Sequence, residues 1–137
     1  MSIKITKKLL STYRKTKSEI TLLERELAYM KQGDNGFGNS TILDYSTGEA
    51  RAQAVIGFDW ERYGRRQQEL EKKRARCKAV EDWIEGIEDT RTRAVFRMRY
   101  IEGLAWENIA TKTGYASSPD YPRLMIRDKF LKKNGIS

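Results

Sequence analysis

The chain has no histidine, and its only cysteine is Cys77. The commonest general base and the commonest zinc ligand are therefore missing, and an intramolecular disulfide is excluded. Cys77 lies in an amphipathic helical pattern, which favours a small core residue over a nucleophile. The chain has two prolines, and this scarcity suits long uninterrupted helices.

Motifs that would bind a nucleotide or a metal are also lacking. The segment GFGNST, residues 36–41, has two glycines two positions apart, but it has no predicted strand before it and no predicted helix after it. Asp34, Asn35 and Asp44 lack the spacing of a calcium loop and its closing glutamate. No acidic pair stands out as catalytic. We therefore predict no enzymatic activity, no catalytic residue, no metal ligand and no cofactor.

Long hydrophobic runs are missing as well. No stretch approaches the roughly 18 apolar residues of a membrane span, and MSIKITKKLLSTYRKTK lacks the apolar segment of a signal peptide. We expect a protein of a reducing cell interior that does not bind membranes. Hydrophobic residues make up 39% of the chain and charged residues 34%, so a large buried core is not expected.

Positive charge, by contrast, is abundant. The net charge is +8 and the isoelectric point is about 9.6. This balance favours an anionic partner, with nucleic acid first and an acidic membrane surface second. Simple solubility is the alternative explanation.

Heptad spacing predicts two long helices. The stripe in residues 3–32 consists of Leu9, Tyr13, Thr16, Ile20, Leu23, Leu27 and Met30. The stripe in residues 53–87 consists of Ile56, Trp60, Tyr63, Gln67, Leu70, Arg74 and Cys77, and it continues at Val80, Ile84 and Ile87 after a slip of one residue. The polar Gln67 and Arg74 either set the register of this seam or break it.

Residues 33–52 separate the two stripes and predict a loop. They are rich in glycine, and Gly33 is expected to end the first helix. Two stripes joined by a loop predict a long antiparallel, coiled-coil-like helical hairpin over residues 1–87. Its seam offers a surface for a homodimer. Residues 33–59 carry one basic and four acidic side chains, so we exclude this loop from any nucleic-acid-binding surface.

Residues 88–137 predict a separate domain of three shorter helices, which completes an all-α fold. Asp89 or Thr90 is the expected N-cap of the first helix. Pro122 lies in the first turn of the third, where its missing N–H does no harm. The glycines expected to end the three helices are Gly103, Gly114 and Gly135. The arginines at 91, 93, 97 and 99 either contact phosphates or pair with Glu88, Asp89 or Glu102.

The second and third of these helices have the parts of a helix-turn-helix, whose second helix lies in the major groove of DNA. Ala110 is the small residue at the helix crossing, Gly114 makes the turn, and Tyr115 packs beneath together with Trp106 and Ile109. Phosphate contacts need cations, and base reading needs side chains near the helix N-terminus. The final helix supplies five basic residues: Arg123, Arg127, Lys129, Lys132 and Lys133.

The segment RMRYIEGLAWENIATKTGY, residues 97–115, resembles the start of a sigma-factor region-4-type helix-turn-helix. Ala105 stands where that pattern usually has a hydroxyl residue, and Asn108 where it usually has an acid. A charged, coiled N-terminal half before such a domain is similar to phage late-transcription regulators of the RinA/ArpU type, although for residues 1–87 the similarity is one of layout only. The positions that match the sigma-type pattern are Tyr100, Gly103, Trp106, Ile109, Ala110, Gly114 and Tyr115.

The turn before the last helix is longer than in the sigma-type pattern. ASSPDYP, residues 116–122, adds roughly three residues between the glycine–aromatic pair and the recognition helix. We expect Tyr121 and Arg123 to lie nearest the bases and Ser117 and Ser118 to contact phosphate. The other expected DNA-binding residues are Arg127, Lys129, Lys132 and Lys133.

The resemblance implies a DNA-binding transcriptional regulator, a phage late-gene activator that acts with host RNA polymerase in the bacterial cytoplasm. Two other functions remain open. One is a phage small terminase subunit, which recognises DNA for packaging and assembles into rings. The other is a helical adaptor that binds only protein. In the simplest structural alternative the basic face is merely solvated, and the core contains Leu124, Ile126, Phe130 and Leu131.

Overall fold

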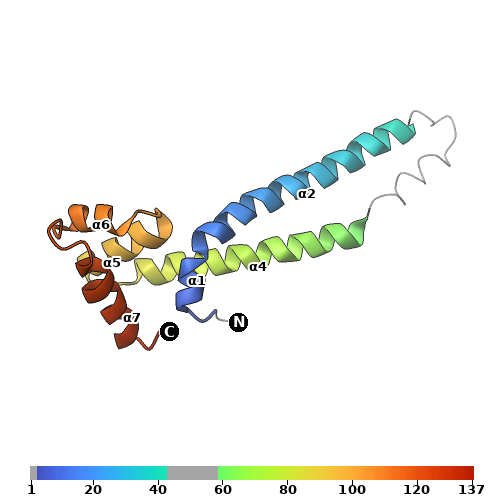
Figure 1. The fold of residues 1–137 in the computed structure, drawn as a ribbon. Helices are drawn as coiled ribbons and strands as arrows, with labels where there is room; N and C mark the ends of the chain where they lie inside the picture. The colour runs from blue at the N-terminus through green and yellow to red at the C-terminus, as the bar shows by residue number, and fades with distance from the viewer. Residues whose placement is uncertain (1–2, 43–58) are drawn as a thin grey trace. The chain divides into compact units, whose positions relative to one another are not determined.

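The computed structural model describes residues 3–42 and 59–137, and every element within them is helical (Figure 1). The predicted all-α fold is confirmed. The chain divides into two compact units, each described by itself: unit 1 combines Met1–Lys17 with Arg74–Ser137, and unit 2 is Ser18–Lys73. The C-terminal helices therefore share a unit with residues that precede the predicted domain boundary at 87. Residues 43–52 of the predicted loop lie outside the described residues.

The first predicted helix is interrupted near its start. Helix α1, Lys7–Ser11, begins after Thr6, whose Oγ1 accepts a hydrogen bond from the Leu9 N–H at 3.0 Å. At Thr12 the backbone turns to φ −96° and ψ 2°. Because of this interruption Leu10 is buried, with 1% exposed, while the predicted core residue Leu9 is only half-buried.

Helix α2, Tyr13–Ile42, continues through Gly33, where the sequence predicted its end. A glycine inside a helix costs roughly 1 kcal/mol relative to alanine, and that is too little to end a helix by itself. Four residues of the predicted stripe, Tyr13, Ile20, Leu23 and Leu27, are buried, and the other two in this helix, Thr16 and Met30, are half-buried.

Helix α4, Trp60–Glu85, confirms part of the predicted stripe, because Leu70, Cys77, Val80, Ile84 and, just after the helix, Ile87 are buried. The earlier part of the stripe differs, and Ile56 lies outside the described residues. Gln67 and Arg74 are exposed, and the side chain of Trp60 is 60% exposed. The observed stripe keeps heptad spacing without a slip and consists of Arg66, Leu70, Lys73, Cys77, Val80, Ile84 and Ile87. The prediction set the phase from Ile56, Trp60 and Tyr63 and therefore placed Gln67 and Arg74 in the seam. The structure places Arg66 and Lys73 there instead, since Arg and Lys bury their methylene stems and keep the charged end in water.

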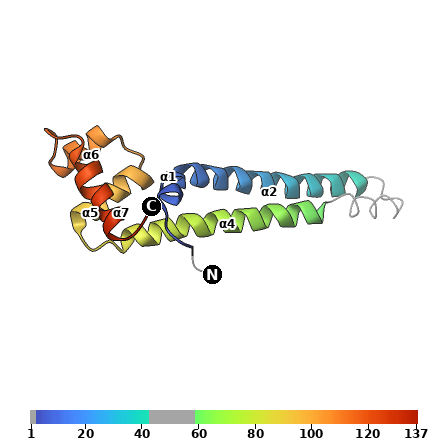
Figure 2. The same ribbon diagram turned by 60° about the horizontal axis from the view of Figure 1, so that its bottom comes forward.

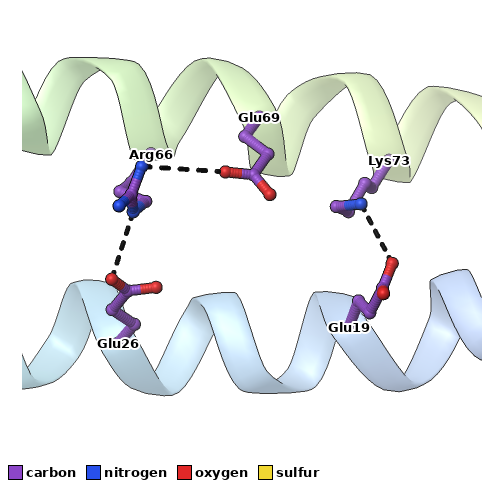
Figure 3. A network of polar contacts seen from close by, with 5 residues as sticks. All are labelled: Glu19, Glu26, Arg66, Glu69 and Lys73. Atoms are coloured by element: carbon purple, nitrogen blue, oxygen red, sulfur yellow. Dashed lines mark hydrogen bonds and ion pairs between the residues drawn. The ribbon is translucent and has the colours of Figure 1, made fainter.

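In unit 2, two ion pairs join the segments of α2 and α4 (Figure 3). Arg66 Nε lies 3.1 Å from Glu26 Oε2, and Lys73 Nζ lies 3.0 Å from Glu19 Oε1. The residue numbers of the two pairs change in opposite directions, so the helix segments run antiparallel. Partly exposed pairs of this kind contribute roughly 0–1 kcal/mol each. Their main effect is therefore to fix the register around buried Leu23, Leu27 and Leu70.

Unit 1 contains the remaining short helices (Figure 2). Helix α5, Thr90–Phe96, continues into the π-helical turn η1, Arg97–Ile101. Helix α6, Trp106–Thr113, follows. The last helix begins as the π-helical turn η2, Pro122–Asp128, and continues as α7, Lys129–Lys133. Asp89 caps α5 as predicted, since its Oδ2 accepts hydrogen bonds from the backbone N–H of Thr92 at 2.9 Å and from its hydroxyl at 2.8 Å.

Phe96 is the centre of the unit 1 core and is fully buried. Its ring centroid lies 5.4 Å from those of Trp83 and Phe130 and 5.8 Å from that of Tyr100. These contacts connect the end of α4 with α5, η1 and α7. Cys77 is also buried, as predicted, with 3% of its surface exposed.

Candidate nucleic-acid interface

Three helical segments, α5–η1, α6 and η2–α7, pack against one another in unit 1 (Figure 2). Ala110 is completely buried, as expected of the small residue at a close helix crossing. Gly114 ends α6 with φ +91°, and the Tyr115 N–H then donates to the Ala110 carbonyl at 2.7 Å. This left-handed ending is the usual role of glycine at a helix C-terminus. It lets the chain turn sharply after α6.

Stacked tyrosines close the long turn that precedes the last helix. The rings of Tyr115 and Tyr121 lie 4.3 Å apart at an interplanar angle of 21°. Between them, the Ser118 N–H donates to the Tyr115 carbonyl at 2.8 Å, and the Tyr121 N–H donates to the Ser118 carbonyl at 2.9 Å. The extra residues therefore form a compact turn, with Ser117 and Ser118 exposed at its surface.

Arg91 of α5 lies at this turn. Its Nη1 donates to the Tyr115 hydroxyl at 3.3 Å, and its guanidinium carbon lies 5.6 Å from the Tyr115 ring centroid. The exposed Arg91 thus extends the tyrosine pair with a cation. Sequence reasoning did not single out Arg91, because nothing in the local pattern shows that residues 91 and 115 meet.

The other three arginines of α5–η1 bond within unit 1. Arg93 Nη1 donates to the Ile87 carbonyl at 2.7 Å, and Arg99 Nη1 donates to the Leu104 carbonyl at 3.1 Å. Arg97 lies 3.8 Å from Glu102, one of the predicted acidic partners, and 3.6 Å from Glu85. These contacts leave Arg91 as the arginine of this set that lies beside the turn.

The last helix divides its basic residues between two sides. Lys129, Lys132 and Lys133 are exposed. Arg123 is half-buried, and its Nη2 lies 3.2 Å from Asp120 Oδ1. Arg127 lies on the inner side, with 16% of its side chain exposed. Of the eight predicted DNA-binding residues, Arg127 is therefore the one that the fold separates from the outer surface.

Arg127 is held by three contacts inside unit 1. Its Nε lies 2.8 Å from Asp128 Oδ1, its Nη1 donates to the Tyr100 hydroxyl at 3.4 Å, and its guanidinium lies 4.9 Å from the Trp106 ring centroid. Burial alone lowers the pKa of Arg127, but the contacts with Tyr100 and Asp128 outweigh burial and raise the pKa above its ordinary value. Arg127 thus keeps its charge and anchors η2 against η1 and α6.

Apolar side chains lie on the outer side of the last helix beside the lysines. Tyr121, Leu124 and Met125 are 39%, 44% and 42% exposed. Lys129 and Lys132 of the same helix are exposed with them. We call this surface, formed by Tyr121, Leu124, Met125, Lys129 and Lys132, the outer face. Leu124 is thus not a core residue, whereas Leu131 is buried.

Other kinds of site are not apparent in the part of the chain that the structure describes. Residues 3–42 and 59–137 contain no group of three or more Cys, Asp or Glu side chains placed to hold a metal ion. Within the same stretches, no helix combines the length and the apolar character that crossing a bilayer requires. A scan against models of protein families found no match to this chain, and searches of curated proteins and of solved structures found none either.

Proposed function

We propose that this protein binds double-stranded DNA by placing the outer face of η2–α7 in the major groove. The observation that carries the proposal is the division of the last helix: Arg127 anchors its inner side, while Lys129, Lys132 and Lys133 are exposed. A recognition helix needs this combination of a rigid support and free cations. We propose no enzymatic role.

The outer face also has side chains suited to reading bases. Tyr121 and Arg123 lie in the first turn of the helix, the part that meets base edges in helix-turn-helix proteins. Leu124 and Met125, both exposed, can contact the methyl groups of thymine. Ser117, Ser118 and Arg91 lie at the preceding turn, and in this proposal they bind phosphates.

In the cell, the proposed role is regulation of transcription, as a phage late-gene activator that acts with host RNA polymerase in the bacterial cytoplasm. The similarity of residues 97–115 to the sigma-factor pattern supports this part of the proposal. A homodimer would supply two recognition helices for a palindromic site. In unit 2, the exposed side chains of Leu22 and Tyr29, which are 62% and 74% accessible, support pairing with a second copy.

The test measures DNA affinity against salt concentration for a triple variant, Lys129→Gln, Lys132→Gln and Lys133→Gln. Each phosphate contact contributes about 0.9 to the slope of log affinity against log salt. The triple variant should therefore bind more weakly and lose roughly 2 to 3 from the magnitude of that slope. Fluorescence anisotropy with labelled duplexes drawn from the promoters and packaging regions of the source genome provides the measurement.

A matched control removes the same charge elsewhere. Lys15, Lys31 and Lys72 are exposed and lie outside the helix-turn-helix segments. Replacing these three lysines with glutamine should change the salt slope by less than about 1. If the two triple variants lose affinity and slope equally, the outer face has no special role and the chain binds DNA through its net charge alone.

A protein-binding adaptor is the second candidate, and the exposed Tyr121, Leu124 and Met125 favour it. Exposed apolar clusters rimmed by polar residues are typical of protein interaction sites. An adaptor would bind its partner with little dependence on salt, and Leu124→Gln with Met125→Gln would abolish that binding. Absence of DNA binding by the wild-type chain at low salt would favour this function over the first.

A further inference from the structure

A cavity of about 310 Å³ in unit 1 lies away from the outer face and is lined by three arginines. The arginines come from different elements: Arg14 from the start of α2, Arg99 from η1 and Arg127 from η2. None of the described lining residues is acidic. Guanidinium groups that surround one space repel one another, and an anion bound in that space offsets the repulsion. The complete lining is Leu10, Ser11, Arg14, Arg99, Tyr100, Gly103 and Arg127.

Trp106 fixes two of these arginines. The guanidinium carbons of Arg99 and Arg127 lie 4.8 Å and 4.9 Å from its ring centroid. Stacking on an aromatic ring uses the flat face of a guanidinium, and the N–H groups on its edge stay available for a planar anion. The Leu104 carbonyl and the Asp128 carboxylate each take one donor. The two groups are thereby held in place before any ligand binds.

Arg14 completes the cavity without a polar partner of its own. Among the described residues it makes no hydrogen bond or ion pair, and its guanidinium packs against the backbone of Gly103. A Cβ atom built on Gly103 would overlap the guanidinium of Arg14. Gly103 also has φ +75°. Glycine at this position therefore allows the positive φ of the turn and, because it has no Cβ atom, leaves room for the side chain of Arg14.

We propose that this cavity, the arginine pocket, binds a phosphate group. Asp128 neutralises part of the charge of Arg127, which leaves a net charge of about +2 on the lining, suited to a phosphate dianion. The hydroxyls of Ser11 and Tyr100 add donors, because the Tyr100 oxygen accepts from Arg127 and its own proton is still available. Small-ligand pockets span roughly 300–1,000 Å³, so a phosphate with a small attached group fits.

The phosphate can come from the DNA backbone or from a free phosphate-bearing molecule, and both offer the same chemistry to the pocket. The test uses the full chain and the variant Arg14→Gln, which removes a donor that has no partner among the described residues. Lys15→Gln is the matched control, because Lys15 is the next residue, is exposed and carries the same charge. Circular dichroism should show that both variants remain helical.

The first measurement contains no DNA. Inorganic phosphate is titrated by calorimetry at constant ionic strength, with chloride as the replaced anion. A hydrogen bond to a charged group supports affinity by roughly ten- to a hundredfold, so Arg14→Gln should weaken phosphate binding by that factor. Lys15→Gln should stay within about twofold. Because DNA is absent, this result is independent of the groove-binding proposal.

The second measurement identifies the source of the phosphate. If the DNA backbone supplies it, Arg14→Gln weakens duplex binding and lowers the salt slope by about 1, and free phosphate competes with DNA. If a free molecule supplies it, phosphate affinity falls in Arg14→Gln while duplex affinity equals that of Lys15→Gln. The proposed phosphate site is refuted if Arg14→Gln and Lys15→Gln have equal affinities for inorganic phosphate and equal affinities for duplex DNA.

Discussion

Gly114 provides a direct test of the turn that joins α6 to the last helix. At φ +91° the residue lies in the left-handed region, and a Cβ built on it would have no atom within 4 Å. Any effect of Gly114→Ala therefore comes from the backbone. An L-residue in a left-handed conformation costs about 1–2 kcal/mol, and the stiffer unfolded chain offsets about 0.4–1 kcal/mol of this. Taking the middle of both ranges, we expect a net loss of roughly 0.8 kcal/mol in the free energy of unfolding.

Two further substitutions isolate the cause. Asparagine tolerates the left-handed region better than alanine, so Gly114→Asn should be less destabilising than Gly114→Ala. Gly64 lies within α4, and a Cβ there would also have no atom within 4 Å. Gly64→Ala should therefore stabilise unit 2 by roughly 0.5–1 kcal/mol, because alanine is the better helix former. The two alanine substitutions should therefore change the free energy of unfolding in opposite directions, although neither added Cβ atom meets a neighbouring atom within 4 Å.

Urea unfolding measures these differences. Far-UV circular dichroism follows the whole chain, and tryptophan fluorescence in a Trp60→Phe background follows unit 1 through Trp83 and Trp106. A Gly114→Ala variant as stable as the wild type, or less harmful than Gly114→Asn, would falsify the assignment of a left-handed turn at this residue.

Two other predictions concern the anchor and the cap. Arg127→Gln should lower the free energy of unfolding of unit 1 by about 1–3 kcal/mol, because Tyr100 and Asp128 lose their charged partner. In the same urea assay, Lys129→Gln should change the free energy of unfolding by less than about 0.5 kcal/mol. Equal effects of the two substitutions would contradict the inward placement of Arg127. The backbone hydrogen bond from Thr92, followed by that from its hydroxyl, lowers the pKa of Asp89 below its ordinary value. Its stabilisation is therefore present at neutral pH and is lost as the pH falls below about 4. Asp89→Asn should flatten the dependence of the urea midpoint on pH in this range, and a profile as steep as that of the wild type would count against the cap.

The sequence was most informative where local chemistry decides the structure. The buried stripe of α2, the cap at Asp89 and the glycine endings at Gly103, Gly114 and Gly135 follow from periodicity and from backbone conformations that glycine adopts easily; all three glycines have positive φ. The prediction was wrong at Gly33, which lies inside α2, and at Gln67 and Arg74 in α4, which are exposed. In α4, Arg66 and Lys73 occupy seam positions because Glu26 and Glu19 pair with them from the facing helix. Only packing reveals such partners.

The candidate interface shows the same limit. The sequence indicated the helix-turn-helix segments and a basic last helix, but it placed Arg127 with the DNA-binding lysines. Helix phase separates them, because Phe130 and Leu131 lie three and four residues after Arg127 and share its face, whereas Lys129 and Lys132 do not. The prediction grouped the cations of the last helix by charge and did not apply this phase. The partners of Arg127, namely Tyr100 and Trp106, lie more than twenty residues away along the chain. The stack of Arg91, Tyr115 and Tyr121 was missed for the same reason.

By itself, the sequence determined that the chain is helical, that it has no histidine and cannot form an intramolecular disulfide, and that its last helix is strongly basic. These properties depend on composition and on spacing over a few residues. The tertiary structure alone decided which cations stack on Trp106 and that Arg14 meets Arg99 and Arg127 at one cavity. Contacts between residues far apart in the chain fix those choices, because each depends on how the helices pack and not on the pattern within any one of them.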